Sequence, residues 1–219
     1  MSGTERPVAE PTDIAVIGIG RMGWHMAAHL AAAGHRVTVS DVSSQAMDSW
    51  TAEHRGCANA DPAGAVHRAR IVITSLPADP QLRAVADAIV PKLEPGVVWV
   101  DHSTTSARAA REVAAEVSAV GAHFLDAPVS GGVDGARKGT LTVMAGGDDD
   151  AFATVEPVLA AYGARIVLMG PAGAGQITKM TNQICVVGLC QALAEGLDFA
   201  ETSGLDVNKV IHVMLQGSS

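Results

Sequence analysis

A glycine-rich turn near the amino terminus carries the clearest chemical signal in this chain of 219 residues. A short apolar run, Ala15–Ile17, leads into a Gly-x-Gly-x-x-Gly pattern, and an alanine-rich helical pattern follows to Ala33. In such a turn the first glycine allows the bend, the second lets the backbone approach a pyrophosphate, and the third lets the helix pack on the strand. The alternative is an ordinary strand–turn–helix unit without a ligand. The candidate dinucleotide contacts are Gly18, Ile19, Gly20, Arg21, Met22 and Gly23.

An acidic residue follows at the distance that a dinucleotide site requires. A second strand-like run, Val37–Ser40, ends in Asp41, roughly 20 positions beyond the glycines. A carboxylate there accepts hydrogen bonds from a free ribose 2′-hydroxyl and repels a 2′-phosphate, and residues 42–45 supply no Arg or Lys. Asp41 therefore favours NAD as the cofactor and leaves NADP as the second choice. If Asp41 only caps the next helix, the choice stays open.

A second loop could hold a small anion. It reads Asp126-Ala127-Pro128-Val129-Ser130-Gly131-Gly132. The Ser130 hydroxyl and the amides of Gly131 and Gly132 can together bind a carboxylate through short hydrogen bonds. The alternative is a glycine-rich turn that binds nothing.

Lys179 is the third candidate, in the first turns of a long helical pattern. Asn182 and Gln183 follow at i+3 and i+4, so the ammonium and the amides share a helix face. A lysine in a cleft could exchange the proton of a substrate hydroxyl during hydride transfer, and partial burial would lower its pKa. The alternative is a solvated surface lysine.

The elements that must position these residues alternate between strand-like and helical patterns. Such alternation predicts an α/β fold with a mainly parallel, doubly wound sheet, which binds ligands outside the carboxyl ends of its strands. We expect the strands after Asp126 to extend this sheet antiparallel along one edge. The expected strands are Ile14–Ile17, Val37–Ser40, Ile71–Ser75, Val97–Val100, Phe124–Leu125, Leu141–Met144 and Ile166–Met169.

The pattern changes at the Gly/Pro/Ala-rich segment 170–175. A nearly continuous helical pattern runs from Gln176 to about Ser203, and a second helix begins near Asp206. We expect a flexible leader over residues 1–12, a dinucleotide-binding domain over 13–171, and the start of an all-α substrate or dimerisation domain over 172–219. The long helix is apolar on several faces and little chain follows it, so we expect a truncated chain, a partner, or a homodimer through this helix.

Composition narrows the functional class. The formal net charge is −8 and no basic stripe with aromatic residues is present, which argues against nucleic-acid binding. Residues 1–12 lack the apolar segment of a signal peptide, and no uninterrupted apolar run reaches membrane-spanning length. Cys57, Cys185 and Cys190 have no metal-ligand or CxxC spacing. We expect reduced thiols, no metal, and a cytoplasmic protein.

Together these stretches resemble the β-hydroxyacid dehydrogenase family, which includes 3-hydroxyisobutyrate dehydrogenase and tartronate semialdehyde reductase. The matching residues occur in the family's order over almost the whole chain. They are Gly18–Gly23, Ala33-Gly34-His35, Asp101-His102-Ser103-Thr104, Asp126–Gly132, Gly139-Thr140-Leu141, and Gly173–Lys179 with Asn182.

The resemblance implies NAD(P)-dependent oxidation of a short 3-hydroxy acid, resembling 3-hydroxyisobutyrate or the tartronate semialdehyde couple, with Lys179 as the acid/base. It also implies substrate binding by Ser130, Gly131 and Gly132, helped by Asn182 or Gln183. Further cofactor contacts are implied for Leu76, Pro77, Ser103 and Thr104. Family members continue through several more helices than this chain, so a non-catalytic dinucleotide-binding scaffold or an inactive fragment is the alternative.

Two related families fit less well. The 6-phosphogluconate dehydrogenases share the architecture and the helix lysine, but they carry a His where this chain has Asn182. Imine reductases share the fold and generally replace the lysine, whereas Lys179 is present here.

Overall fold

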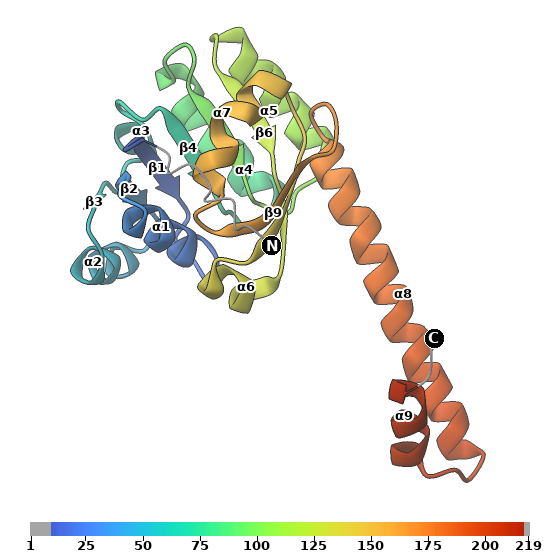
Figure 1. The fold of residues 1–219 in the computed structure, drawn as a ribbon. Helices are drawn as coiled ribbons and strands as arrows, with labels where there is room; N and C mark the ends of the chain where they lie inside the picture. The colour runs from blue at the N-terminus through green and yellow to red at the C-terminus, as the bar shows by residue number, and fades with distance from the viewer. Residues whose placement is uncertain (1–9, 217–219) are drawn as a thin grey trace, which may run out of the picture. The chain divides into compact units, whose positions relative to one another are not determined.

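The computed structural model describes residues 10–216 and contains a six-stranded, wholly parallel sheet (Figure 1). Its strand order is β3-β2-β1-β4-β5-β6. This is the doubly wound dinucleotide-binding order, in which the chain starts at the centre and winds outward in two directions. The predicted fold class is confirmed. The strands are β1 (Asp13–Ile17), β2 (Arg36–Ser40), β3 (Cys57–Ala58), β4 (Ile71–Thr74), β5 (Val98–Asp101) and β6 (His123–Asp126).

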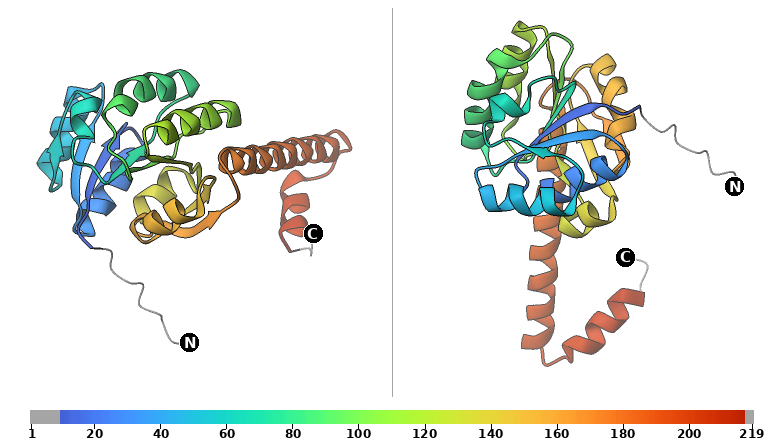
Figure 2. Two further views of the ribbon diagram at one scale, coloured as in Figure 1. Left: turned by 90° about the horizontal axis from the view of Figure 1, so that it is seen from above. Right: turned by 90° about the vertical axis from the view of Figure 1, so that its left-hand side faces the viewer.

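Helices cover both faces of this sheet. Because side chains alternate along a strand, each buried strand supplies both faces. Met26 and Leu30 of α1 pack on one face with Leu159 of α7, and Leu82 of α4 and Val113 of α5 pack on the other. Figure 2 shows the two sets of helices on opposite sides of the sheet. The helices are α1 (Gly23–Ala32), α2 (Ser44–Glu53), α3 (Pro62–Ala65), α4 (Asp79–Ile89), α5 (Ala107–Ala119) and α7 (Asp149–Leu159), with a 3₁₀ turn at Val90–Lys92.

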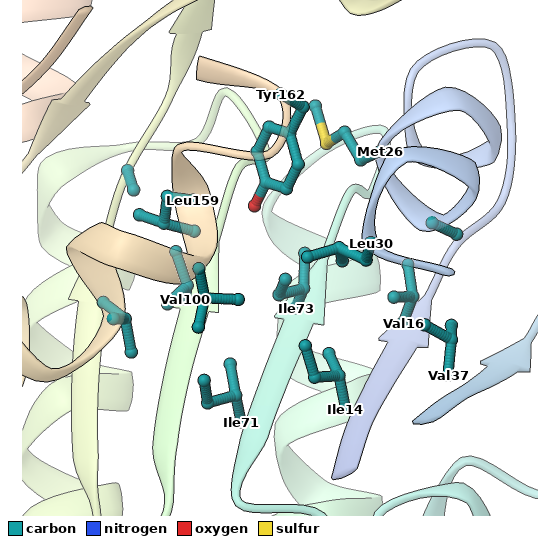
Figure 3. Close-up of a cluster of buried hydrophobic side chains, with 14 of the residues drawn as sticks. Ile14, Val16, Met26, Leu30, Val37, Ile71, Ile73, Val100, Leu159 and Tyr162 are labelled. Atoms are coloured by element: carbon teal, nitrogen blue, oxygen red, sulfur yellow. The ribbon is translucent and has the colours of Figure 1, made fainter. Parts of the chain in front are cut away.

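Figure 3 shows the hydrophobic cluster on the face of the sheet that α1 and α7 cover. Ile14 and Val16 of β1, Ile71 and Ile73 of β4, and side chains of α1 belong to this one cluster. Tyr162, in the turn after α7, belongs to the same cluster and is fully buried. The sheet edge that carries the candidate loops is thus supported by a continuous core.

The strands after Asp126 correct one expectation. They form a separate three-stranded sheet, β7-β8-β9, in which β7 and β8 are antiparallel and β8 and β9 are parallel. Only one isolated antiparallel bridge, Asp126 with Gly146, joins this part to β6 in the described structure. A short helix, α6, begins at Gly132, the last residue of the candidate anion-binding loop. The bounds are β7 (Val129–Ser130), α6 (Gly132–Lys138), β8 (Leu141–Ala145) and β9 (Gly163–Leu168).

Two further helices end the described chain, α8 (Ala174–Thr202) and α9 (Val207–Gln216). The chain divides into two compact units, residues 1–179 and 180–219, so α8 begins in the first unit and continues into the second. By length and composition alone α8 could cross a membrane, because its mean hydropathy reaches 1.3 over a window that is 6% buried. Polar residues interrupt the apolar stretches of α8, so the criterion of an uninterrupted apolar run does not detect this helix.

Candidate dinucleotide and substrate site

The three glycines of the turn have three different surroundings. Gly18 has a φ of +86°, and a Cβ there would lie 2.5 Å from the Ser75 carbonyl oxygen. A Cβ on Gly23 would lie 2.0 Å from the Gly18 carbonyl oxygen, so this glycine permits close helix–strand packing. Nothing lies within 4 Å of a Cβ on Gly20. The crowded glycines therefore shape the turn, and the open one leaves room for a pyrophosphate.

Asp41 is attached directly to this turn. Its Oδ2 accepts a hydrogen bond from the Ile19 amide at 2.8 Å, and its Oδ1 accepts one from the Ser43 amide at 2.9 Å. The cap of α2 is Ser43, whose Oγ accepts from the Ala46 amide at 3.2 Å. Asp41 is therefore not the cap of α2. Each of its oxygens keeps acceptor capacity, which fits the hydroxyls of a ribose.

The predicted cofactor loops after β4 and β5 are joined by hydrogen bonds. Ser103 Oγ accepts from the Leu76 amide at 2.8 Å and donates to Asp101 Oδ1 at 2.5 Å. Leu76 also borders Gly18, since a Cβ on that glycine would lie 3.1 Å from Leu76 Cδ2. Pro77 and Thr104 are exposed beside them. Three loops at the carboxyl ends of the central strands thus form one surface.

Beneath this surface lies the buried carboxyl of Asp101. Its Oδ1 accepts from Thr74 Oγ1 at 2.6 Å, and Thr74 Oγ1 accepts in turn from Trp99 Nε1 at 2.9 Å. Its buried Oδ2 has no hydrogen-bond partner among the described residues. Burial raises the pKa of Asp101 above its usual range, against the lowering effect of the hydrogen bonds from Ser103 and Thr74. Asp101 supports the Ser103 loop from below.

His102 is structural in this arrangement. It is buried, with Nδ1 2.6 Å from the Ala127 carbonyl oxygen and Nε2 2.8 Å from the Tyr162 hydroxyl. A carbonyl can only accept, so Nδ1 carries the proton and Nε2 accepts from Tyr162. Burial lowers the pKa of His102 to about 4. The neutral imidazole therefore ties the end of β5 to the turn before β9.

The candidate substrate loop lies close to the glycine turn. Ser130 is half-buried at the end of β7 and pairs with Thr142 of β8, while Gly131 and Gly132 are exposed. Val133, the next residue, lines a surface hollow together with the glycine turn. The whole lining is Ile19, Gly20, Arg21, Trp24, His25 and Val133. The residue that follows the candidate substrate loop thus borders the same hollow as the glycine turn.

The start of α8 is fixed at the carboxyl ends of β5 and β6. Asp126 accepts hydrogen bonds from the amides of Gly173 and Gln176, and the side chain of Gln176 bonds to the backbone at Ser103 and Thr105. Lys179 follows one turn later and is half-buried. Burial, with no contribution from another charge, lowers the pKa of Lys179. This shift favours the neutral amine that a proton acceptor needs.

Asn182 and Gln183 belong to the second compact unit. Asn182 Nδ2 donates to Gln183 Oε1 at 3.3 Å. They follow Lys179 by three and four residues on the continuous helix α8, the spacing that places residues on one helix face. Their part in a substrate site therefore stays a prediction.

The comparisons with known proteins agree with this arrangement. Residues 13–170 match the family described as the NAD binding domain of 6-phosphogluconate dehydrogenase. Residues 173–219 match the family described as the NAD-binding domain of NADP-dependent 3-hydroxyisobutyrate dehydrogenase. A 3-hydroxyisobutyrate dehydrogenase of Pseudomonas aeruginosa is 39% identical over 211 residues, which cover 94% of this chain and 70% of that protein. The chain belongs to the β-hydroxyacid dehydrogenase family.

Other members of this family are similarly close. An uncharacterised oxidoreductase of Shewanella frigidimarina is 46% identical over 209 residues, covering 94% of this chain and 72% of that protein. The solved structure of the 3-hydroxyisobutyrate dehydrogenase of Mycobacterium tuberculosis with L-serine superposes with a TM-score of 0.90 at 36% identity, covering 95% of this chain and 71% of that one. This β-hydroxyacid dehydrogenase homologue thus has an NAD(P)-binding domain, and α8 lies within its second matched segment.

Sequence reasoning gave no separate role to Asp126 or Gln176, although both lie in the matching stretches. Asp126 and Gln176 act on the backbone, and neither the pattern nor the spacing of the chain marks their partners. The Gly-rich segment before α8 indicated free helix amides, since helix N-termini present them. Nothing in the sequence places Asp126, 47 residues earlier, beside those amides. Among the described residues no group of three or more His, Cys, Asp or Glu could hold a metal ion.

Proposed function

We propose that this protein oxidises the hydroxyl group of a short 3-hydroxy acid with NAD, using Lys179 as the acid/base. The observation that carries the proposal is the position of Lys179. It lies one turn beyond Gln176, whose side chain bonds to the loop that carries Ser103 and Thr104. A half-buried amine at the edge of a dinucleotide site is suited to take a proton from a bound hydroxyl.

The cofactor would lie along the carboxyl ends of the central strands. The amides after Ile19 and the open space at Gly20 would hold the pyrophosphate, and Asp41 would accept from the adenosine ribose. Asp41 with no Arg or Lys in residues 42–45 supports NAD over NADP. When bound, the nicotinamide ring supplies the hydride acceptor. Leu76, Pro77, Ser103 and Thr104 would contact the cofactor on the β4 and β5 side.

The substrate carboxylate would bind at the loop of Ser130, Gly131 and Gly132. This loop offers one hydroxyl and exposed backbone, and the adjoining Val133 lines the same hollow as Gly20. Asn182 or Gln183 would add amide hydrogen bonds. A carboxylate held at a fixed distance from the reacting carbon orients that carbon for transfer.

Lys179 would enter the reaction as a neutral amine. As the substrate hydroxyl loses its proton to Lys179 Nζ, the C–H bond at the same carbon breaks, and its hydrogen and electron pair leave as a hydride. The products are the carbonyl acid, the reduced cofactor and an ammonium at Lys179. The lowered pKa of Lys179 favours this direction, because the amine must be unprotonated to accept.

Candidate substrates share a carboxylate and a hydroxyl on the third carbon. 3-Hydroxyisobutyrate, the acid of the tartronate semialdehyde couple, and L-serine all fit that description. The first is named for the Pseudomonas relative, and the last accompanies the Mycobacterium structure.

We also infer a homodimer and a cytoplasmic location. Large apolar side chains of the second unit are exposed, among them Ile184, Leu189 and Phe199, and a second copy would cover them. Cys57, Cys185 and Cys190 are free and exposed, as is usual in a reducing compartment.

A panel assay tests this function. The protein is mixed with NAD and each 3-hydroxy acid in turn, and reduced cofactor is followed by its absorbance. The proposal is supported if the protein oxidises at least one of these acids and does not oxidise the corresponding amide. Tight NAD binding without turnover of any acid would make the protein a dinucleotide-binding scaffold and overturn it.

A further inference from the structure

The buried carboxylate of Asp126 holds the amino end of α8 onto the sheet. Its Oδ1 accepts from the Gly173 amide at 2.6 Å, and its Oδ2 accepts from the Gln176 amide at 2.9 Å. These amides lack partners within the helix, because the first turn of any helix has none. A carboxylate at that end is also favoured by the helix dipole. Asp126, at the end of β6, thus supplies the hydrogen-bond acceptors that these two amides lack within the helix.

Gln176 makes the reciprocal connection from the helix to the sheet. Its side chain is fully buried. Oε1 accepts from the Thr105 amide at 3.1 Å, and Nε2 donates to the Ser103 carbonyl oxygen at 2.8 Å. One side chain therefore satisfies two backbone groups of the loop after β5. We call Asp126 and Gln176 the α8 clamp.

The α8 clamp is continuous with the cofactor side of the site. The Ser103 carbonyl oxygen accepts the hydrogen bond from Gln176 Nε2. The hydroxyl of the same residue accepts from the Leu76 amide and donates to Asp101. Lys179 lies three residues after Gln176, on the same helix face. No described side chain makes an ion pair with Lys179, and burial alone shifts its pKa. Its position therefore follows from where the first turn of α8 is held.

We propose that Asp126 and Gln176 are positioning residues, which fix the first turn of α8 against the Ser103–Thr105 loop and thereby set the place of the Lys179 amine relative to the cofactor site. Neither side chain touches the reacting atoms. The inference rests on the proposed function only in taking Lys179 as the acid/base. The geometric part stands on the four hydrogen bonds of the clamp.

The first test measures the Lys179 amine without any turnover. An amine-reactive reagent is applied over a range of pH, and the labelled peptides are quantified by mass spectrometry, with exposed Lys209 as the internal reference. Gln176→Met keeps the volume but removes both side-chain hydrogen bonds. It should release the turn, expose Lys179 to water, and move its titration midpoint upward toward the ordinary value of a lysine. Gln191→Met is the matched control, because Gln191 is exposed on α8 and its side chain donates a hydrogen bond to Glu195, one turn along the same helix.

The second test uses kinetics and cofactor binding. If misplacing the amine by about 1 Å costs up to ~10²-fold in rate, Gln176→Met should lower kcat by at least ~10-fold, a larger factor than its change in the Kd for NAD. Gln191→Met should change neither. Gln176→Glu keeps an oxygen for the Thr105 amide and loses the donor to Ser103. Gln176→Glu should lower kcat by a smaller factor, and it replaces Gln176→Met as the test variant if Gln176→Met does not fold.

The outcomes separate the two proposals. A shifted Lys179 midpoint in protein that turns over no hydroxy acid would support the clamp and reject the proposed function. An unchanged midpoint in folded Gln176→Met, or in Gln176→Glu where the first does not fold, would overturn the clamp. Asp126→Asn gives an independent check, since its amide nitrogen would face one of the two backbone donors, and it should shift the midpoint in the same direction.

Discussion

The Ile19 amide donates a hydrogen bond to Asp41 Oδ2 at 2.8 Å. This bond joins the tip of the glycine turn to the end of β2, so one carboxylate shapes the pyrophosphate loop and faces the expected ribose. A substitution at Asp41 should therefore act on cofactor choice through charge and on cofactor affinity through the loop.

Cofactor preference gives the first prediction. NAD should bind more tightly than NADP, because Asp41 repels a 2′-phosphate and residues 42–45 bring no positive charge. Asp41→Asn should reduce the ratio of the two affinities by roughly 10-fold, about 1.4 kcal/mol. Calorimetric titration of both cofactors measures this, and tighter NADP binding by the unaltered protein would refute it.

Removal of the lysine gives the second prediction. Lys179→Ala should lower the rate of oxidation by ~10²–10⁴, the usual cost of losing an acid/base group, while the Kd for NAD stays near that of the unaltered protein. Steady-state kinetics and calorimetry provide the two numbers. Unchanged turnover would show that Lys179 is only a surface residue.

The glycine turn gives a third prediction through a matched pair of substitutions. Gly23→Ala places a Cβ 2.0 Å from the Gly18 carbonyl oxygen and should lower the melting temperature. Gly20→Ala meets nothing within 4 Å and should leave the melting temperature nearly unchanged, while it weakens NAD binding. If Gly20→Ala binds NAD normally, the pyrophosphate does not lie where we place it.

The neutral imidazole of His102 predicts a pH dependence of stability. Its pKa is about 4 in the folded protein against an ordinary 6.5, so its contribution is complete above pH 6.5 and is lost as the pH falls through about 4. The loss follows a slope of at most about 1.4 kcal/mol per pH unit. Burial raises the pKa of Asp126 to about 6, so Asp126 changes the stability with pH in the opposite direction. Its contribution to the free energy of unfolding is lost as the pH rises through that value.

Comparing His102→Gln with the unaltered protein separates these two groups, since both proteins keep Asp126. Urea unfolding measures the free energy of unfolding between pH 7 and pH 4. This free energy should fall less with decreasing pH in the variant, and the difference between the two proteins should reach up to about 3 kcal/mol at pH 4. Parallel curves would mean that His102 does not titrate as the structure implies.

Self-association is the fifth prediction. The second unit exposes Ile184, Val187, Leu189, Phe199 and Leu215, each more than 60% accessible. Apolar surface of this kind marks interfaces, so the protein should sediment as a dimer at low micromolar concentration. Leu189→Glu should shift the equilibrium toward monomer. A stable monomer of the unaltered protein would contradict the reading.

Much of the fold could be predicted because its signals are local. The apolar runs that form β1, β2, β4 and β5 lie next to strong turn signals, and the alternating order implies a parallel sheet. The strands β3 and β7 have two residues each and carry no period. Helix α6 contains two glycines and is held by tertiary packing, so propensity gave no indication of it.

The residues of the candidate site also divide into those with local sequence signals and those whose roles depend on the folded structure. Gly18, Asp41 and Lys179 could be named from type and spacing, because each acts through its own chemistry. The roles of Asp126, Gln176 and His102 depend on backbone groups that come close only in three dimensions, such as the Ala127 carbonyl beside His102. A sequence alone does not identify such partners.

The most direct test of the account follows the transferred hydrogen itself. The protein is incubated with NAD and 3-hydroxyisobutyrate or L-serine carrying deuterium on the carbon that bears the hydroxyl, and the cofactor is then analysed by mass spectrometry. We expect deuterium in the reduced cofactor with the unaltered protein, and a loss of roughly 10²-fold or more in its rate of appearance with Lys179→Ala. Reduced cofactor without deuterium, or equal rates in both proteins, would contradict this expectation.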